Sequence, residues 1–136
     1  MVEPTWLDKA LVLALYEDVM AASGGKPGLL SEGLLESALA RPINRRLYEG
    51  AEDLLELAAT YAIGLASNHA FVDGNKRIAF MALGQFLIDN GIVLTATDDD
   101  ATDVMLRVAQ SQVTIEQLTE WLRPRTALLF QPRAPR

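Results

Sequence analysis

The stretch HAFVDGNKR, residues 69–77, decides the fold expected for this chain. It places a histidine, a carboxylate, a glycine, an amide and two cations within nine residues, and it opens with His69, the only histidine of the chain. Apolar residues recur at helical spacing on both sides of it. The stretch is therefore expected to connect two helices in a helix–loop–helix motif, with Gly74 in the turn between them.

The helix expected before this stretch has the most regular pattern of the chain. Apolar side chains follow the i, i+3, i+4, i+7 rule over residues 54–66, which gives the helix one continuous hydrophobic face. It should end near Asn68 and place His69 at its C-terminus. The helix after the stretch carries an apolar stripe over residues 79–87 and should end at Gly91.

Two further helices are expected in the N-terminal part. The first begins after Thr5 and ends near Ser23, where glycines interrupt the apolar pattern. The second begins at Ser31, a favourable N-cap residue, and is stopped by Pro42. Proline lacks the N–H group that a helix interior requires, which is why the second helix should end there.

The C-terminal part is expected to add two more helices. One follows the acids at positions 98–100, which suit a helix start better than a metal site because the helix dipole favours carboxylates there. The other begins at a capping box in residues 114–117. No strand, repeat or linker is indicated. Residues 1–124 are thus predicted to form one all-α domain, a compact bundle of about six helices, followed by an Arg/Pro-rich tail at residues 125–136.

Composition excludes several classes of protein. With 136 residues, half of them hydrophobic, the chain suits a single core. No apolar run is long enough to cross a bilayer, so no membrane association is expected. The absence of cysteine and of a signal-peptide pattern favours a cytoplasmic protein without disulfides. The net charge of −6 argues against direct nucleic-acid binding.

Arginines gather in two groups. A solvated surface is the simpler interpretation of both, but the first group is also a candidate for binding the carboxylates of a partner. The groups are Arg41, Arg45 and Arg46, and, near the C-terminus, Arg123, Arg125, Arg133 and Arg136.

The residue types in the stretch 69–77 are those that phosphate chemistry requires. A helix N-terminus with unpaired N–H groups favours a phosphate, and two cations in that first turn, Lys76 and Arg77, are unfavourable unless an anion offsets them. Asp73 is a candidate Mg²⁺ ligand. A single histidine is more often structural than catalytic, but beside these residues His69 is a candidate base near neutral pH. Phe71 is expected to anchor the loop in the core.

These residues resemble the signature of the Fic superfamily and, within it, of the death-on-curing (Doc) toxins. The likeness extends to the glycine-rich segment 24–28, to residues 33–42 and to Asn68 just before the histidine. It covers roughly residues 11–121. The resemblance implies an all-helical domain that transfers part of a nucleoside triphosphate to a protein hydroxyl.

The resemblance also implies roles for individual residues. His69 would activate the target hydroxyl, Asp73 would bind Mg²⁺ together with the phosphates of ATP, and Arg77 would clamp a phosphate. The loop of residues 24–30 resembles the flap that aligns the target segment. The expected catalytic residues are His69, Lys76 and Arg77, and the expected nucleotide-binding residues are Asp73, Gly74, Asn75, Lys76 and Arg77.

Two positions distinguish the branches of the superfamily. The broader Fic pattern has glycine where Lys76 stands and a second arginine where Phe80 stands. The Doc-like branch shares Asn75, Lys76 and Arg77, and in that branch the γ-phosphate is transferred. Transfer of AMP is the first alternative, and an inactive, antitoxin-binding co-repressor is the second. Ile78 and Ala70 also depart from the usual threonine and proline, at positions without an obvious chemical role.

Self-inhibition is not expected. Many Fic proteins carry a Ser or Thr, three residues, Glu, and then Gly or Asn, but the residues four before the two Glu-Gly pairs here are Gly28 and Arg45. We therefore expect the toxin of a type II toxin–antitoxin system, inhibited by a Phd-like protein antitoxin that folds as a helix into a groove. The resemblance implies a protein substrate of the translation machinery, such as elongation factor Tu.

Overall fold

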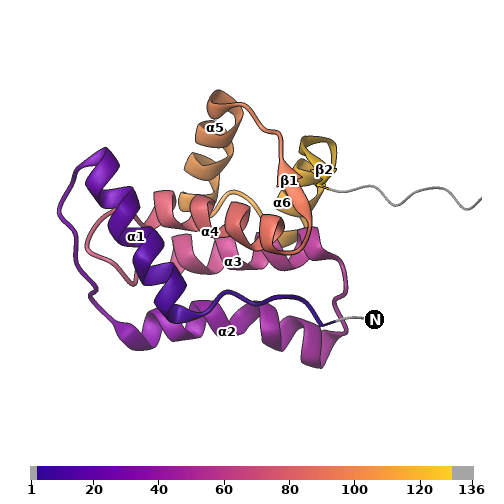
Figure 1. Ribbon diagram of the computed structural model, residues 1–136, viewed down its shortest axis with the longest axis horizontal. Helices are drawn as coiled ribbons and strands as arrows, with labels where there is room; N and C mark the ends of the chain where they lie inside the picture. Colours follow the sequence, from indigo (N-terminus) through magenta and orange to yellow (C-terminus); the bar gives the residue numbers. More distant parts are fainter. Residues whose placement is uncertain (1–2, 130–136) are drawn as a thin grey trace, which may run out of the picture.

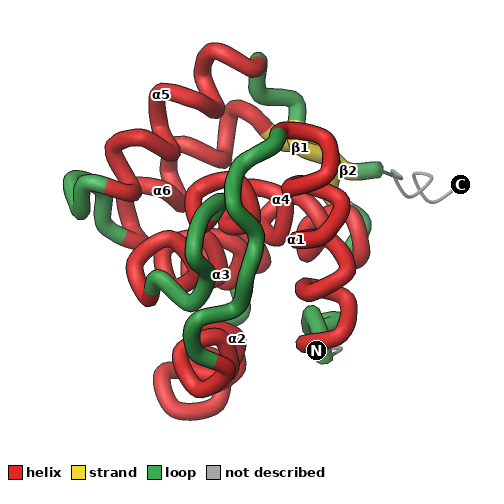
Figure 2. Tube along the Cα trace, turned by 90° about the vertical axis from the view of Figure 1, so that its left-hand side faces the viewer, coloured by secondary structure: helices red, strands yellow, loops and turns green. Residues whose placement is uncertain are grey.

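Helices α3 (Leu54–Asn68) and α4 (Asn75–Asp89) form the centre of the molecule and share its largest helix–helix contact (Figure 1). Helix α2 (Glu32–Glu49) packs along α3, and α1 (Lys9–Ser23) packs against α4. Helices α5 (Asp98–Ala109) and α6 (Ile115–Leu122) contact α3 on the side away from α2 (Figure 2). This computed structural model describes residues 3–129, and it confirms an all-α bundle of six helices.

The core forms around α3 because this helix is hydrophobic on nearly all sides. Ten of its fifteen residues are buried, as expected for a helix enclosed by neighbours on several faces. The ring of Tyr61 in α3 lies 5.1 Å from that of Phe86 in α4, and Trp6 stacks on Phe86 from the N-terminal segment. Contacts between the helices themselves therefore fix α3 and α4 relative to each other.

Helix α2 does not end at Pro42, and the expectation that it would was wrong. The helix continues through this proline to Glu49 and ends at Gly50, whose φ of 70° is left-handed. Pro42 removes the N–H that would bond to the carbonyl of Ala38. That carbonyl lies against Gly64 of α3, where a Cβ atom would be only 3.5 Å from it. Tight packing of α2 on α3, with Pro42 buried, outweighs the lost hydrogen bond.

The first helix begins later than expected. Asp8, not Thr5, is the N-cap of α1, and its side chain accepts a hydrogen bond from the N–H of Leu11 at 2.8 Å. Thr5 is held in the preceding segment because the side-chain amide of Asn90 bonds to its N–H at 2.8 Å and to its carbonyl at 3.0 Å. The capping box at residues 114–117 and the start of α2 at Ser31 are confirmed.

Two short strands were not expected. Strand β1 (Ile92–Leu94) pairs antiparallel with β2 (Thr126–Leu128), which follows the 3₁₀ turn η1 (Arg123–Arg125). Strands of three residues show no two-residue periodicity, so the pattern could not reveal them. Of the predicted tail at residues 125–136, Arg125 ends η1 and residues 126–128 form β2, while residues 130–136 lie outside the described part of the chain.

Within residues 3–129, no helix combines the length and the apolar character needed to cross a membrane.

The stability of the fold should fall in alkali through Tyr61. Burial raises the pKa of this phenol to about 12, so folding favours its protonated form. This contribution is complete below the ordinary tyrosine pKa of about 10 and is lost at about 1.4 kcal/mol per pH unit as the pH rises toward 12. The difference in unfolding free energy between the wild type and Tyr61→Phe, measured with urea, should therefore narrow above about pH 10. A difference independent of pH would contradict the prediction.

Candidate active site

The residues of the stretch 69–77 form the connection between α3 and α4, at the same end of the molecule as the loop between α1 and α2 (Figure 1). Helix α3 ends at Asn68, and His69 follows in a left-handed conformation with φ 56° and ψ 48°. Its side chain is exposed. Gly74, with φ 79°, precedes the first residue of α4. The predicted helix–loop–helix is confirmed, and it presents the histidine to solvent at the end of the helix.

The side chain of Asn75 holds this connection in place through hydrogen bonds to its backbone. Its side-chain oxygen accepts the N–H of Phe71 at 3.1 Å, and its side-chain amide donates to the carbonyl of the same residue at 2.9 Å. Both residues are buried. Because the side chain of Asn75 is used in this way, only its backbone N–H can contribute to a phosphate cradle. The expectation that Phe71 anchors the loop in the core is confirmed.

The N-terminus of α4 differs from those of the other α-helices. Side chains cap α1, α2, α3, α5 and α6, whereas no side chain caps α4. The first intrahelical bond of α4 comes from Ile78, whose N–H donates to the carbonyl of Gly74 at 2.9 Å. The N–H groups of residues 75–77 have no acceptor among the described residues. Such a terminus can receive an anion.

The two cations of this first turn have different surroundings. Arg77 donates to the hydroxyl of Ser23 and to the carbonyl of Gly24 at 3.1 Å, and it lies 3.4 Å from a carboxylate oxygen of Asp73. The arginine is therefore held over the turn by both neighbouring loops. Lys76 is exposed and makes no hydrogen bond or ion pair in the part of the chain that the structure describes.

Asp73 has one carboxylate oxygen engaged and the other facing the loop. Its Oδ1 accepts the N–H of Gly74 at 2.7 Å and faces Arg77, while Oδ2 lies beside Gly25. A Cβ atom at position 25 would fill the space next to Oδ2. A free carboxylate oxygen is the type of ligand that a hard cation such as Mg²⁺ prefers. Among residues 3–129, no three His, Cys, Asp or Glu side chains come together in a group that could hold a metal ion.

The loop before α2 pairs with the connection between α3 and α4. Leu30 donates its N–H to the carbonyl of Ala70 at 2.8 Å, and Val72 donates to the carbonyl of Gly28 at 2.9 Å. These bonds enclose an antiparallel bridge between Leu29 and Phe71. Leu29 and Phe71 thus form a non-hydrogen-bonded pair, in which the N–H and C=O groups of Leu29 point away from Phe71. This loop therefore offers a short free edge beside the motif.

Three residues of α1 contribute to the site although periodicity assigned them to the core or to the helix end. Tyr16 bonds to the backbone of both loops, Met20 packs beneath Gly74, and Ser23 accepts from Arg77. The helical spacing of Tyr16 and Met20 correctly indicated burial. Nothing in the pattern indicated which residues they would pack against, because that depends on how α1 crosses α4.

The arginine groups are engaged within the chain. Arg45 lies 2.8 Å from Glu56 and also reaches Glu49 and Glu116, while Arg46 pairs with Glu3 at 3.5 Å. Near the C-terminus, Arg123 pairs with Asp53 and Glu120, and Arg125 pairs with Asp100 and lies over the ring of Trp121. Arg45 and Arg46 thus form ion pairs within the chain. Arg133 and Arg136 lie outside the described residues.

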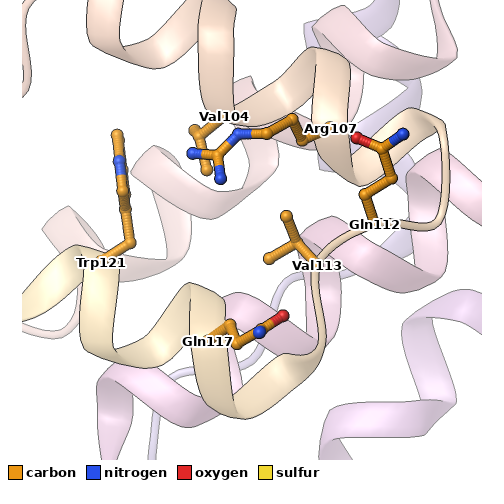
Figure 3. A pocket seen from close by; sticks show the side chains of 6 residues that line it. All are labelled: Val104, Arg107, Gln112, Val113, Gln117 and Trp121. Carbon is orange, nitrogen blue, oxygen red and sulfur yellow. The ribbon is translucent and has the colours of Figure 1, made fainter.

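A hollow of about 230 Å³ lies between α5 and α6, remote in sequence from the motif (Figure 3). The side chain of Arg107 extends toward Trp121, with Val104 beside its guanidinium group and Val113 below it (Figure 3). No residue of the stretch 69–77 lines it. The stretch 69–77 therefore lies apart from this hollow, at the end of the α3–α4 pair.

Residues 6–87 match the Fic/DOC family, which covers the helix–loop–helix and both loops of the site. The chain belongs to this family. It is 31% identical over 112 residues to a protein of Escherichia phage P1 named Protein kinase doc, covering 82% of this chain and 88% of that protein. It is 38% identical over 110 residues to a protein of Mycolicibacterium smegmatis named Toxin Doc, covering 75% of this chain and 84% of that protein.

Alanine at position 74 should destabilise the site, because the left-handed φ of 79° is unfavourable for a side chain and the new Cβ would lie 2.6 Å from the sulfur of Met20. We expect Gly74→Ala to lower the free energy of unfolding by about 1–3 kcal/mol. Gly84→Ala in the same helix is the control, since no atom lies within 4 Å of its Cβ. That change should raise stability by about 0.5–1 kcal/mol. Urea titrations giving the same sign for both variants would refute this view of the turn.

Proposed function

We propose that this chain is the toxin of a toxin–antitoxin pair and transfers the γ-phosphate of ATP to a hydroxyl group of a target protein. The observation that carries the proposal is the N-terminus of α4, which is left without a side-chain cap and bears Lys76 and Arg77 in its first turn. Two cations at the positive end of a helix are stabilised when an anion binds there. The similarity to proteins named Toxin Doc and Protein kinase doc supports this reading.

Different residues of the motif serve different steps of the proposed reaction. The N–H groups at the start of α4, together with Lys76 and Arg77, bind and orient the phosphates. Asp73 would hold Mg²⁺, whose charge neutralises the phosphate oxygens. His69 accepts the proton of the target hydroxyl, whose oxygen then bonds to the γ-phosphorus. The bond from that phosphorus to the bridging oxygen breaks, and ADP leaves.

The position of the loop before α2 fits recognition of an extended segment of the target protein. The outward N–H and C=O of Leu29 can pair with a strand of the target, which would bring a target hydroxyl toward the motif. Exposed apolar side chains surround this edge, and we refer to them as the loop patch: Leu29, Leu30, Leu34 and Val72. The patch suits apolar side chains on either side of the target hydroxyl. A translation factor such as elongation factor Tu is the proposed target, which places the reaction in the cytoplasm.

Lys76 favours phosphate over AMP as the transferred group. Its side chain is exposed at the helix start and adds bulk and charge where the broader Fic pattern has glycine. The nucleotide is then bound in the direction opposite to that in AMP-transferring Fic proteins, with its γ-phosphate toward His69. The name of the phage P1 relative supports kinase chemistry in this branch.

A separate antitoxin is the proposed inhibitor, because the chain lacks the internal inhibitory motif. The loop patch adjoins the motif, so a Phd-like helix with apolar anchors seated on it would prevent the target protein from binding. Antitoxin and target should therefore compete. Of the first arginine group, Arg41 alone makes no ion pair among residues 3–129, and it is the candidate for contacting a carboxylate of the antitoxin.

Replacing the proposed base tests the chemistry. His69→Ala should abolish phosphate transfer, since a general base contributes about 10²–10⁴-fold. Expression of the wild type without an antitoxin should arrest bacterial growth, and the variant should not. The fold should be unaffected, because the side chain of His69 is exposed and makes no hydrogen bond or ion pair with residues 3–129. Growth arrest by a soluble His69→Ala variant at the wild-type rate would contradict the assignment.

Replacing Lys76 tests the choice of transferred group. Lys76→Gly should lower phosphate transfer and permit weak AMP transfer, because the position then resembles that of the broader Fic pattern. Mass spectrometry of the modified target distinguishes the two adducts. Lys76→Arg, which keeps the bulk and the positive charge at this position, is the control and should retain phosphate transfer. Phosphorylation by Lys76→Gly at the wild-type rate would show that Lys76 does not control the outcome.

A further inference from the structure

Tyr16 of α1 is a buried residue whose hydroxyl joins the two loops of the site. It donates to the carbonyl of Asp73 at 2.7 Å and accepts the N–H of Gly28 at 3.3 Å. The side chain is 4% exposed. Phenylalanine would fill the same space without making either bond, so packing alone does not explain the hydroxyl.

The ring of Tyr16 supports the turn from below. It stacks on the ring of Phe71 with 3.9 Å between centroids and 16° between planes. One turn further along α1, Met20 packs under Gly74, and a Cβ atom there would also lie 3.4 Å from Tyr16. This face of α1 therefore packs against the segment that carries Asp73 and leads into α4.

The same hydroxyl holds the other loop. Gly28 is fixed at both of its backbone groups, since its carbonyl accepts the N–H of Val72 and its N–H donates to Tyr16. The bond to Val72 sets the distance between the loops. The bond to Tyr16 ties the loop to α1 as well. Gly28 immediately precedes Leu29, whose free edge is the proposed contact for the target protein.

We infer that Tyr16 is a positioning residue that sets the target-binding loop in register with the phosphate cradle, an inference that rests on the proposed function. Transfer requires the target hydroxyl and the γ-phosphorus to meet in line, and a misplacement of about 1 Å can cost about 10²-fold in rate. The hydroxyl of Tyr16 bonds both to the segment before α4, which is proposed to hold the phosphates, and to the loop before α2, which is proposed to hold the target protein. Its loss leaves the core volume and the charges of the motif unchanged but removes the bonds from α1 that hold both segments, so that only the direct backbone bonds between the two loops remain.

Tyr16→Phe is the variant that tests this inference, and Tyr61→Phe is its matched control. Both changes remove one buried hydroxyl that bonds to backbone, but Tyr61 bonds to the N–H of Leu7, away from the motif. Tyr16→Phe should lower kcat for phosphate transfer to the target protein by about 10- to 100-fold. Its KM for ATP should change by no more than about twofold, because the phosphate-binding groups are retained. Tyr61→Phe should leave both constants unchanged.

Hydrogen exchange supplies a readout that does not depend on activity. In Tyr16→Phe, the amides of residues 24–30 should exchange faster than in the wild type and in Tyr61→Phe, while those of α3 remain protected. Equal kcat in the two tyrosine variants, or unchanged exchange in the loop, would overturn the inference. If the wild type transfers no phosphate, the proposed function fails, and loop exchange alone decides whether Tyr16 couples the segments.

Discussion

The two hydrogen bonds between the side chain of Asn75 and the backbone of Phe71 are the constraint on which the site depends. They close residues 71–75 into a turn whose two ends, Phe71 and Asn75, are buried. The N-cap position of α4 is held by Gly74, which has no side chain to accept a hydrogen bond, so the helix begins with unpaired N–H groups. This open helix end can receive an anion.

The rest of the site is arranged around this turn. Helix α1 supports it through Tyr16 and Met20, and the loop before α2 covers one side through its bridge to Phe71. Arg77 is held by Asp73 and by the end of α1, so it is already ordered over the helix N-terminus. Preorganised donors and cations lower the cost of binding phosphate, because little has to move when the anion arrives.

The sequence predicted the helices and the motif well because both depend on local chemistry. Regular apolar spacing located α3 and α4, and His69 lies at the expected helix end. Predictions failed where tertiary contacts outweigh local preference: α2 continues through Pro42 because it packs tightly on α3, and Thr5 is held by Asn90 instead of capping a helix. The pairing of β1 with β2 is a contact between distant segments that no local pattern contains.

Within the site, the residue types suggested a chemistry but not which residues would contact one another. The pattern identified Asn75 as a polar residue of the motif, yet only the structure shows that its side chain is directed at Phe71. Likewise, helical spacing assigned Tyr16 to the core, whereas its hydroxyl bonds to two loops. Such roles depend on how helices cross, which a single sequence does not specify.

The central claim is that this arrangement transfers the terminal phosphate of ATP to a protein. The most direct measurement is incubation of the purified chain with bacterial lysate and ATP labelled either at the α-phosphate or at the γ-phosphate. The account predicts that protein retains label only from the γ-position. Retention of the α-label would show transfer of AMP, and retention of neither would contradict the claim that the chain is an enzyme of this kind.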